Sequence, residues 1–376
     1  MILFLHNRYR TTGGEERVVE QLLELVREQL GEPAQMLSRD SAAIGRASAA
    51  RGLLWGGLAP RDVAKAIRLS GARVVHAHNL NPAFGWRALA AAREAGARVV
   101  LHLHQYRLVC ANGVCFTGGV QCTRCHGRNT LPGVLHNCRG SRAEGLAYGA
   151  ALALWQRRMA EQADAVIVPS SFARERLREL EAPLRWERVH VLAPPVAVAA
   201  DVAAPGREAY ALVVSRLAPE KGIDVAIDAC RRAGVRLVIA GDGPELGALR
   251  ARAAGHDVRF AGRVDDAELG RLRLGAALAI VPSRSGETFG MAAAEAMAAG
   301  VPVVASRIGA LAELVEEERA LVEPGDPVAL AAAIERRWGD EDAGRRGQTR
   351  VRERCAPAVV ARGLARIYSD APSAGV

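Results

Sequence analysis

Residues 278–306 read Leu278-Ala279-Ile280-Val281-Pro282-Ser283-Arg284-Ser285-Gly286-Glu287-Thr288-Phe289-Gly290-Met291-Ala292-Ala293-Ala294-Glu295-Ala296-Met297-Ala298-Ala299-Gly300-Val301-Pro302-Val303-Val304-Ala305-Ser306. The apolar run 278–281 predicts a buried strand, and the Ala-rich run 289–299 predicts a helix that starts beyond the strand's end. A helix N-terminus presents free backbone N–H groups, which favours a phosphate there. Glu287 precedes this helix and Glu295 lies two turns inside it. One carboxylate can therefore face a ligand at the helix start while the other accepts hydrogen bonds from vicinal hydroxyls.

Two further loops follow predicted strands in the same half of the chain. The strand 210–214 runs into Ser-Arg-Leu-Ala-Pro-Glu-Lys-Gly-Ile-Asp (215–224), which places Arg216 and Lys221 in a strand-to-helix loop. The strand 235–240 runs into a loop that begins with Gly241. Open α/β sheets bind ligands at the carboxyl ends of their strands, so we expect the three loops to converge. Of 50 basic residues only Lys65 and Lys221 are lysines. A lysine at position 221 in so arginine-rich a chain indicates that this position requires a compact point charge rather than a planar guanidinium group.

A Glu-x7-Glu spacing alone also fits an ordinary βαβ unit, with Glu287 as a helix cap and Glu295 as a solvated side chain. The three loops together resemble the donor-binding half of the GT-B glycosyltransferases, specifically the retaining group called family 4. The resemblance implies an α/β protein of the GT-B type, with two Rossmann-like doubly wound domains that face a cleft. It also implies transfer of a sugar, with retention of configuration, from a UDP or GDP sugar to a glycan, lipid-linked or small-molecule acceptor.

The resemblance assigns roles to individual residues of this chain. Arg216, Lys221 and the helix start would stabilise the leaving diphosphate, and no catalytic metal is expected there. Glu295 would hold the ribose, while Glu287 and His104 would orient the sugar. The remaining donor-binding positions are Gly13, Gly14, Gly241, Thr288, Phe289, Gly290 and Met291.

The residue after His104 departs from the family pattern. The family has an aspartate at this position, and this chain has Gln105. The change removes a negative charge, which puts in doubt any role that needs a protonated imidazole. A hydrogen bond from His104 to a sugar hydroxyl is not affected.

Strands and helices alternate along the whole chain, which predicts parallel sheets. Apolar strands are expected at 2–6, 74–78, 99–103 and 165–168, with helices at 15–30 and 86–95. A proline pair at 194–195 and an unpatterned stretch at 197–206 mark a domain boundary. We therefore expect an acceptor-side domain over 1–195 and a nucleotide-sugar domain over 206–355. The resemblance implies that residues 356–376 form a terminal helix and tail that cross back to the first domain.

A cysteine-rich insertion is expected over about 106–140. The spacing Cys110-x11-Cys122-x2-Cys125-x12-Cys138 suits a tetrahedral zinc site of four thiolates, and Cys115, His126 or His136 could replace one ligand. Free thiols are the alternative, and disulfides are less plausible without a secretory signal. A subset of family-4 enzymes carries a similar insertion, with cysteines that match these four. Four thiolates leave no open position for water, so the zinc would be structural.

The basic composition does not indicate a nucleic-acid partner. The formal net charge is +9, but the arginines are dispersed, aromatic residues make up 4%, and no recognition motif is present. The apolar run at 1–5 is too short for a signal peptide, and no run reaches the ~18–20 residues of a membrane span, so we expect a cytoplasmic protein. The hydrophobic segment 145–159 predicts a core helix. An interfacial helix in peripheral contact with anionic lipid on the inner membrane face is the alternative.

Two other classes of function remain open. A GT-B epimerase acting on UDP-N-acetylglucosamine would share the nucleotide-binding half but would need carboxylates for proton abstraction. A non-catalytic, zinc-stapled scaffold would bind nucleotide or membrane without turnover. The sequence does not identify the nucleotide base, the donor sugar or the acceptor, because the loops that contact them follow no general code.

Overall fold

The computed structural model describes residues 1–9, 13–200, 203 and 209–369. The chain divides into two compact units. Unit 1 comprises Met1–Thr117, Cys122–Pro195 and Pro357–Val376, and unit 2 comprises Gly118–Gln121 and Val196–Ala356. The tail expected after residue 369 lies outside the described residues, as do residues 201–202 and 204–206 of the stretch expected at the domain boundary.

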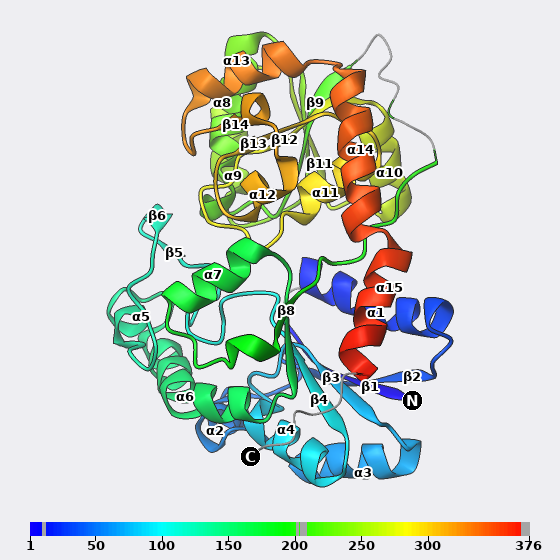
Figure 1. The fold of residues 1–376 in the computed structure, drawn as a ribbon. Coiled ribbons are helices and arrows are strands. Elements are labelled where there is room, and N and C mark those ends of the chain that lie inside the picture. The colour runs from blue at the N-terminus through cyan, green and yellow to red at the C-terminus, as the bar shows by residue number, and fades with distance from the viewer. Residues whose placement is uncertain (10–12, 201–202, 204–208, 370–376) are drawn as a thin grey trace. The chain divides into compact units, whose positions relative to one another are not determined.

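Unit 1 is built on a six-stranded parallel sheet with the order β2-β1-β3-β4-β7-β8 (Figure 1). Most positions of the inner strands are apolar and buried, as a parallel sheet covered on both faces requires. The strands are β1 (Ile2–Arg8), β2 (Ala34–Asp40), β3 (Val74–Ala77), β4 (Arg98–His102), β7 (Ala165–Val168) and β8 (Val189–Val191). Its helices are α1 (Gly14–Gln29), α2 (Arg46–Trp55), α3 (Pro60–Ser70), α4 (Gly85–Glu94), α5 (Leu131–Leu135), α6 (Arg142–Glu161), α7 (Ser171–Glu179), η1 (Trp186–Arg188) and α15 (Pro357–Ser369).

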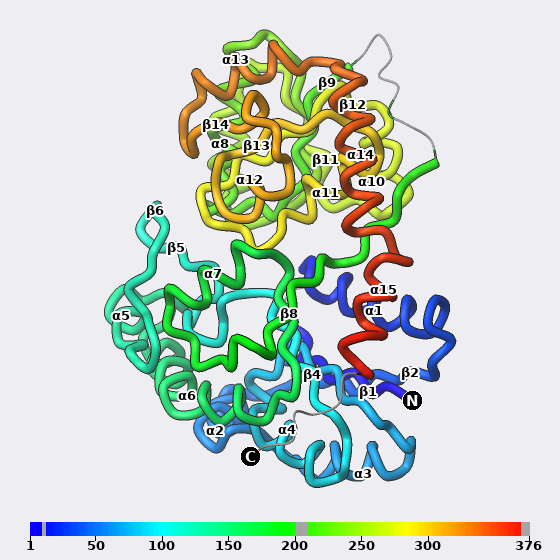
Figure 2. The backbone as a smooth tube through the Cα atoms, viewed as in Figure 1, coloured from blue at the N-terminus to red at the C-terminus, as the bar shows by residue number. Residues whose placement is uncertain are grey.

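The helix α15 completes unit 1 although it follows unit 2 in the sequence. The chain leaves unit 1 after β8 and returns with α15, which packs against α1 and β4 (Figure 2). The side chains of Val360, Leu364, Ile367 and Tyr368 on α15 are buried. Residues that are distant in sequence therefore share one hydrophobic core.

Unit 2 repeats the same plan with a parallel sheet of order β11-β10-β9-β12-β13-β14. Its strands are β9 (Tyr210–Val214), β10 (Leu237–Ala240), β11 (Val258–Gly262), β12 (Ala276–Val281), β13 (Val303–Ser306) and β14 (Leu321–Val322). Its helices are η2 (Pro219–Lys221), α8 (Ile223–Ala233), α9 (Leu246–Arg252), α10 (Asp266–Leu274), α11 (Met291–Ala298), α12 (Ala310–Val315), η3 (Glu318–Ala320), α13 (Pro327–Arg337) and α14 (Glu341–Cys355). The core lies between the sheet and α8 and α13, where Ile227, Val304 and Ile334 are buried.

Two expectations about local structure are corrected. The helix expected from residue 289 begins at Met291, because Gly290 has a φ of +99° that a right-handed helix does not allow. The cysteine-rich insertion, whose sequence has no helical or strand period and so predicts no element, contains a two-stranded sheet of β5 (Phe116–Thr117) and β6 (Val120–Gln121) and the short helix α5. These elements are too short to leave a recognisable hydrophobic period.

Candidate functional site

Lys221 and Glu287 meet at the carboxyl edge of the unit 2 sheet. Lys221 ends η2 after β9, and Glu287 lies in the loop after the neighbouring strand β12. The Lys221 Nζ atom lies 2.8 Å from Glu287 Oε1, and the Ser283 hydroxyl donates to the same oxygen. Burial raises the pKa of Glu287, but the Lys221 ammonium and the Ser283 hydroxyl outweigh it, so this pKa lies below its ordinary value. Glu287 is therefore an anion at neutral pH.

Close backbone approach locks these loops together. Gly222 has a φ of +63°, and a Cβ atom there would lie 2.1 Å from the Pro282 carbonyl oxygen. At Gly241 a Cβ atom would lie 1.8 Å from the Ser215 carbonyl oxygen. The loop after β9 thus touches the loops after both β10 and β12. Side chains at either glycine would push these loops apart.

The start of α11 faces the same edge of the sheet. Thr288 and Phe289 precede the cap residue Gly290, and Met291 begins the helix. The first turn carries no acidic residue. Glu287 is fixed by its own backbone, since its carbonyl oxygen accepts the Ala310 N–H at 2.9 Å. A helix start with free N–H groups beside an ammonium group favours a phosphate anion.

Arg216 and Glu295 each have a partner in this structure. The Arg216 guanidinium pairs with Glu220 one turn away and remains 58% exposed. Glu295 pairs with Arg273 of α10, and both side chains are mostly buried. A ribose that binds Glu295 would therefore contact a carboxylate already held in place by Arg273.

In unit 1, His104 follows β4 and contacts other histidines that lie in or directly after β3 and β4. We call His76, His78, His102 and His104 the histidine cluster. The His78 Nδ1 and His104 Nε2 atoms are 2.8 Å apart, and the His102 and His104 rings stack with centroids 4.2 Å apart. His104 is partly exposed, whereas the other three are buried. Burial lowers the pKa of His104 to about 4, so its imidazole is neutral at neutral pH.

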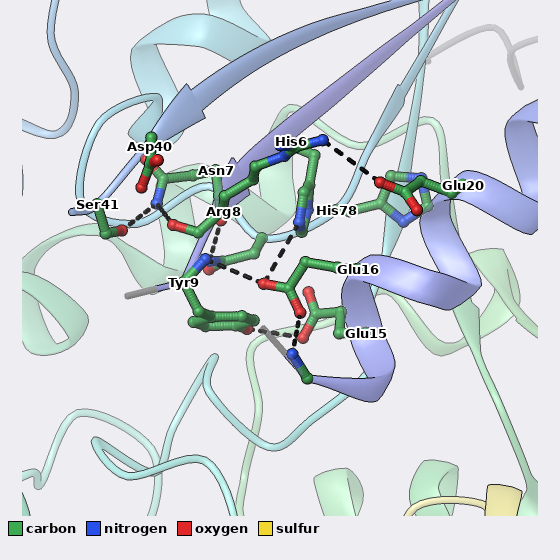
Figure 3. A network of polar contacts seen from close by, with 12 residues as sticks. His6, Asn7, Arg8, Tyr9, Glu15, Glu16, Glu20, Asp40, Ser41 and His78 are labelled. Carbon is green, nitrogen blue, oxygen red and sulfur yellow. Dashed lines mark hydrogen bonds and ion pairs between the residues drawn. The ribbon is translucent and has the colours of Figure 1, made fainter. Parts of the chain in front are cut away.

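A polar network that the sequence does not predict lies beside Gly13 at the start of α1 (Figure 3). Glu16 accepts the backbone N–H groups of Tyr9 and Gly13, at 3.0 and 2.8 Å. The Tyr9 hydroxyl donates to Glu15 at 2.6 Å, and Gln105 donates to the same Glu15 oxygen at 3.0 Å. A carboxylate from α1 therefore contacts the glutamine that replaces the family's aspartate. The signal available in the sequence was the pair of glutamates directly after Gly13 and Gly14.

The cysteines of the insertion line one pocket. Its wall includes all four predicted zinc ligands, the extra thiol and one of the histidines named as a substitute: Cys110, Cys115, Cys122, Cys125, Cys138 and His136. His126 does not line this pocket and has an exposed side chain. The donor set thus has the soft thiol chemistry that zinc prefers. In the described part of the chain, however, no three of these sulfur atoms lie within 4.8 Å of one another. The thiols therefore line one pocket, but their sulfur atoms are too far apart in this structure to bind one ion.

His76, His78 and His102 are the one set of three metal-capable side chains, within the described residues, whose ligand atoms lie within 4.8 Å of one another. Their hydrogen bonds oppose a metal site. The two nitrogens of His76 contact Tyr368 and His102, at 2.7 and 3.2 Å. The His76 and His102 rings are nearly parallel, 12° apart, whereas metal ligands point their lone pairs at one centre.

Two family models together match most of the chain. The model described as glycosyl transferase 4-like domain matches residues 12–195, and the model described as glycosyl transferases group 1 matches residues 198–354. The chain belongs to the group 1 glycosyltransferases.

Curated relatives share part of this glycosyltransferase. A GDP-mannose-dependent phosphatidylinositol dimannoside mannosyltransferase of Mycobacterium tuberculosis is 39% identical over 125 residues, which are 32% of each chain. A glycogen synthase of the same species is 40% identical over 154 residues, 38% of this chain and 37% of the relative. This glycosyltransferase thus matches about a third of the length of these relatives.

Solved structures share the GT-B fold over the whole chain. The sucrose-phosphate synthase of Thermosynechococcus elongatus matches with a TM-score of 0.70 and 20% identity, over 98% of both chains. A glycosyltransferase of Rickettsia africae matches with a TM-score of 0.71 and 15% identity, over 99% of both chains. Among the described helices, none is long and apolar enough to span a bilayer.

Proposed function

We propose that the protein transfers a sugar from a nucleotide-sugar donor to a glycan, lipid-linked or small-molecule acceptor with retention of configuration. The observation that carries the proposal is the Lys221–Glu287 pair beside the start of α11, held where the strands of unit 2 end. A UDP or GDP sugar is the expected donor. A structural relative from Anabaena was solved with UDP and glucose, and a mycobacterial relative is named for GDP-mannose.

Unit 2 supplies the charges that the leaving group needs. Cleavage of the glycosyl–phosphate bond places negative charge on the diphosphate, which Lys221, Arg216 and the N–H groups at the start of α11 stabilise. Because Lys221 is already paired with Glu287, the ammonium is held in place before the donor binds. Glu295 holds the ribose hydroxyls, and Gly241 lets the backbone approach the nucleotide.

Unit 1 and Glu287 act on the sugar. The neutral His104 imidazole offers a hydrogen bond to a sugar hydroxyl, and Glu287 accepts one. The acceptor attacks from the face that the diphosphate leaves, and the leaving phosphate takes the acceptor's proton. The mechanism needs no metal at the diphosphate. Asp340, in the segment Asp340-Glu341-Asp342, caps α14 and pairs with Arg337 and so has a structural role.

A donor panel tests the proposal. Purified protein is incubated with radiolabelled UDP-glucose, UDP-N-acetylglucosamine and GDP-mannose, with and without candidate acceptors, and nucleoside diphosphate release is measured. We expect release from at least one donor and an acceptor product with the donor's anomeric configuration. Conversion of UDP-N-acetylglucosamine to its epimer would support the epimerase. Binding of nucleotide without turnover of any donor would support the scaffold.

The cysteine pocket is proposed to hold a structural zinc ion. Cys110, Cys122, Cys125 and Cys138 would bind it, with His136 or Cys115 as substitutes at one position. The thiol-rich wall supports the proposal. Four thiolates around one ion would cross-link distant parts of the insertion and would leave no coordination position open for a substrate. Its function is to order the segment that follows His104.

A cytoplasmic location is proposed for the protein, with peripheral contact to anionic lipid through the outer face of α6. The helix α6 is mainly a core helix, as expected, because Tyr148, Ala151 and Leu152 are buried. Its outer face carries Leu146 and Leu154, 61% and 47% exposed, near the exposed Arg142 and Arg157. Apolar side chains flanked by arginines favour an anionic bilayer. Sedimentation with phosphatidylglycerol vesicles, but not with phosphatidylcholine vesicles, is the expected result.

A further inference from the structure

The histidine cluster extends behind His104 to a tyrosine at the end of the chain. The Tyr368 hydroxyl on α15 lies 2.7 Å from His76 Nδ1, and His76 Nε2 lies 3.2 Å from His102 Nδ1. The His102 ring stacks on the His104 ring at 4.2 Å and 14°. These four groups belong to three elements of unit 1, namely α15, β3 and β4 with the residues that follow it.

The positions of the protons along this chain follow from the hydrogen bonds. Tyr368 is a neutral phenol, since burial raises its pKa. His76 is the one hydrogen-bond partner that the described residues give its hydroxyl, so the hydroxyl must donate to His76 Nδ1. A neutral His76 then carries its proton on Nε2 and donates it to His102 Nδ1. His102 in turn carries its own proton on Nε2.

The alternative arrangement is less favourable. If His76 donated from Nδ1 to Tyr368, the buried hydroxyl hydrogen would have no acceptor within the described residues, whereas the first arrangement leaves the His102 Nε2–H group without one. A phenol hydroxyl is a more acidic donor than an imidazole N–H, and an imidazole nitrogen is a stronger acceptor than a phenol oxygen, so the arrangement in which Tyr368 donates is favoured. Protonation of a second ring nitrogen is also opposed, because burial lowers the pKa of His76 to about 3.

We propose that Tyr368 is a positioning residue for His104, through the fixed proton positions of His76 and His102 and the stacking of His102 on His104. His78 completes the arrangement, because its Nδ1 atom shares a hydrogen bond with His104 Nε2 at 2.8 Å. The ring of His104 is thereby held on one face by His102 and at one nitrogen by His78. The helix that ends the chain thus acts on the residue proposed to contact the donor sugar, and this inference rests on the proposed function.

The test replaces Tyr368 with phenylalanine, which keeps the buried ring and removes the hydroxyl. With UDP-glucose, UDP-N-acetylglucosamine or GDP-mannose, whichever the wild type turns over, we expect Tyr368→Phe to lower kcat about fivefold with little change in donor KM, as the loss of one buried hydrogen bond suggests. Nitrogen-15 spectra of histidine-labelled protein should show His76 and His102 protonated on Nε2 in the wild type. In Tyr368→Phe the His76 signal should shift towards a mixture of tautomers.

Three further variants control for loss of stability. Tyr210→Phe removes a hydroxyl that donates to a backbone oxygen in unit 2, so it should leave kcat and the histidine spectra unchanged. His76→Gln keeps a donor near the Nε2 position and should retain more activity than His76→Leu. An Nδ1-protonated His76 in the wild type, or a Tyr368→Phe variant with unchanged spectra and unchanged kcat, would overturn the inference. If the wild type turns over no donor, the proposed function fails, and the spectra alone then decide whether Tyr368 sets the tautomers.

Discussion

Lys221 joins two loops because its partner Glu287 follows a different strand. Glu220, which directly precedes Lys221 in the sequence, forms an ion pair with Arg216 instead. The pair is 25% and 14% exposed, so it is partly shielded from water and salt. Each side chain is therefore poised before any ligand arrives, and its removal affects both the charge of the site and the position of its partner.

Replacement of Lys221 with alanine should lower donor turnover at least about tenfold, because a charged hydrogen bond to the leaving phosphates would be lost from the transition state. Arg216→Ala should act in the same direction. Lys65→Ala is the matched control, since Lys65 is the chain's other lysine and is exposed on α3 in unit 1. Steady-state kinetics measures the effect, and normal turnover in both Lys221→Ala and Arg216→Ala would exclude the phosphate role.

Replacement of Glu287 and replacement of Glu295 should have different effects on catalysis and on nucleotide binding. Glu287→Gln should lower kcat with saturating donor, whereas Glu295→Gln should mainly weaken nucleotide binding in calorimetry. Glu295→Gln also removes the carboxylate that pairs with the mostly buried Arg273, so a lower Tm is expected as well. Arg273→Gln should reproduce the drop in Tm. Unchanged nucleotide affinity in Glu295→Gln would remove its ribose role.

At the scale of elements, β3 and β4 place an unusual number of titratable side chains in a buried position. The pKa of each histidine in the cluster is lowered by burial, to about 3 for His76 and well below 6.5 for His78 and His102. The Glu16 carboxylate raises the pKa of His104, but the effect of burial is larger. Protonation of these rings in the folded protein is therefore unfavourable at neutral pH.

Stability should fall as the pH drops below about 6.5. The unfolded chain binds protons on histidine at this pH, while the folded chain does so only near the lowered pKa values, so acid favours unfolding. Between about pH 7.5 and pH 5, His76 alone should account for about 2 kcal/mol. Urea unfolding at the two pH values measures this, and His76→Gln should show the smaller dependence. His256→Gln in unit 2 is the control; a His76→Gln variant with the wild-type pH dependence would contradict the prediction.

The cysteine-rich insertion should depend on zinc for its order. It has only short elements of its own, so metal-binding energy would be folding energy for residues 106–140. Elemental analysis should find about one zinc per chain, and Cys122→Ser or Cys125→Ser should release it, loosen the segment and lower turnover. Cys230→Ala, a change in the core of unit 2, should keep the metal. Protein purified without chelator that contains no zinc would reject the site.

At the scale of the whole molecule, the end of the chain completes the unit that the beginning of the chain starts. The helix α15 packs against α1 and β4, and its Leu364 side chain is fully buried. Unit 1 is therefore built from two segments separated by the whole of unit 2. The core of unit 1 therefore includes side chains from both segments.

Leu364→Ala should destabilise unit 1 by about 2–5 kcal/mol, as expected for a fully buried leucine. Urea unfolding followed by tryptophan fluorescence reports chiefly on unit 1, since four of the five tryptophans lie there: Trp55, Trp86, Trp155 and Trp186. Leu69→Ala on α3 is the control, because Leu69 is 78% exposed. Equal stability of the two variants would show that α15 is not part of the unit 1 core.

The sequence by itself determined the α/β class, the strands that carry the loops, and the residues around Lys221 and Glu287. These features follow from local patterns, because apolar runs and glycine loops have their effect within a few residues of each other. The contact of Gln105 with Glu15, the pairing of Glu295 with Arg273, and the hydrogen bond of Tyr368 to His76 were decided by the tertiary structure alone. Each joins residues from separate elements, up to 292 positions apart for Tyr368 and His76, and no local pattern encodes such a pairing.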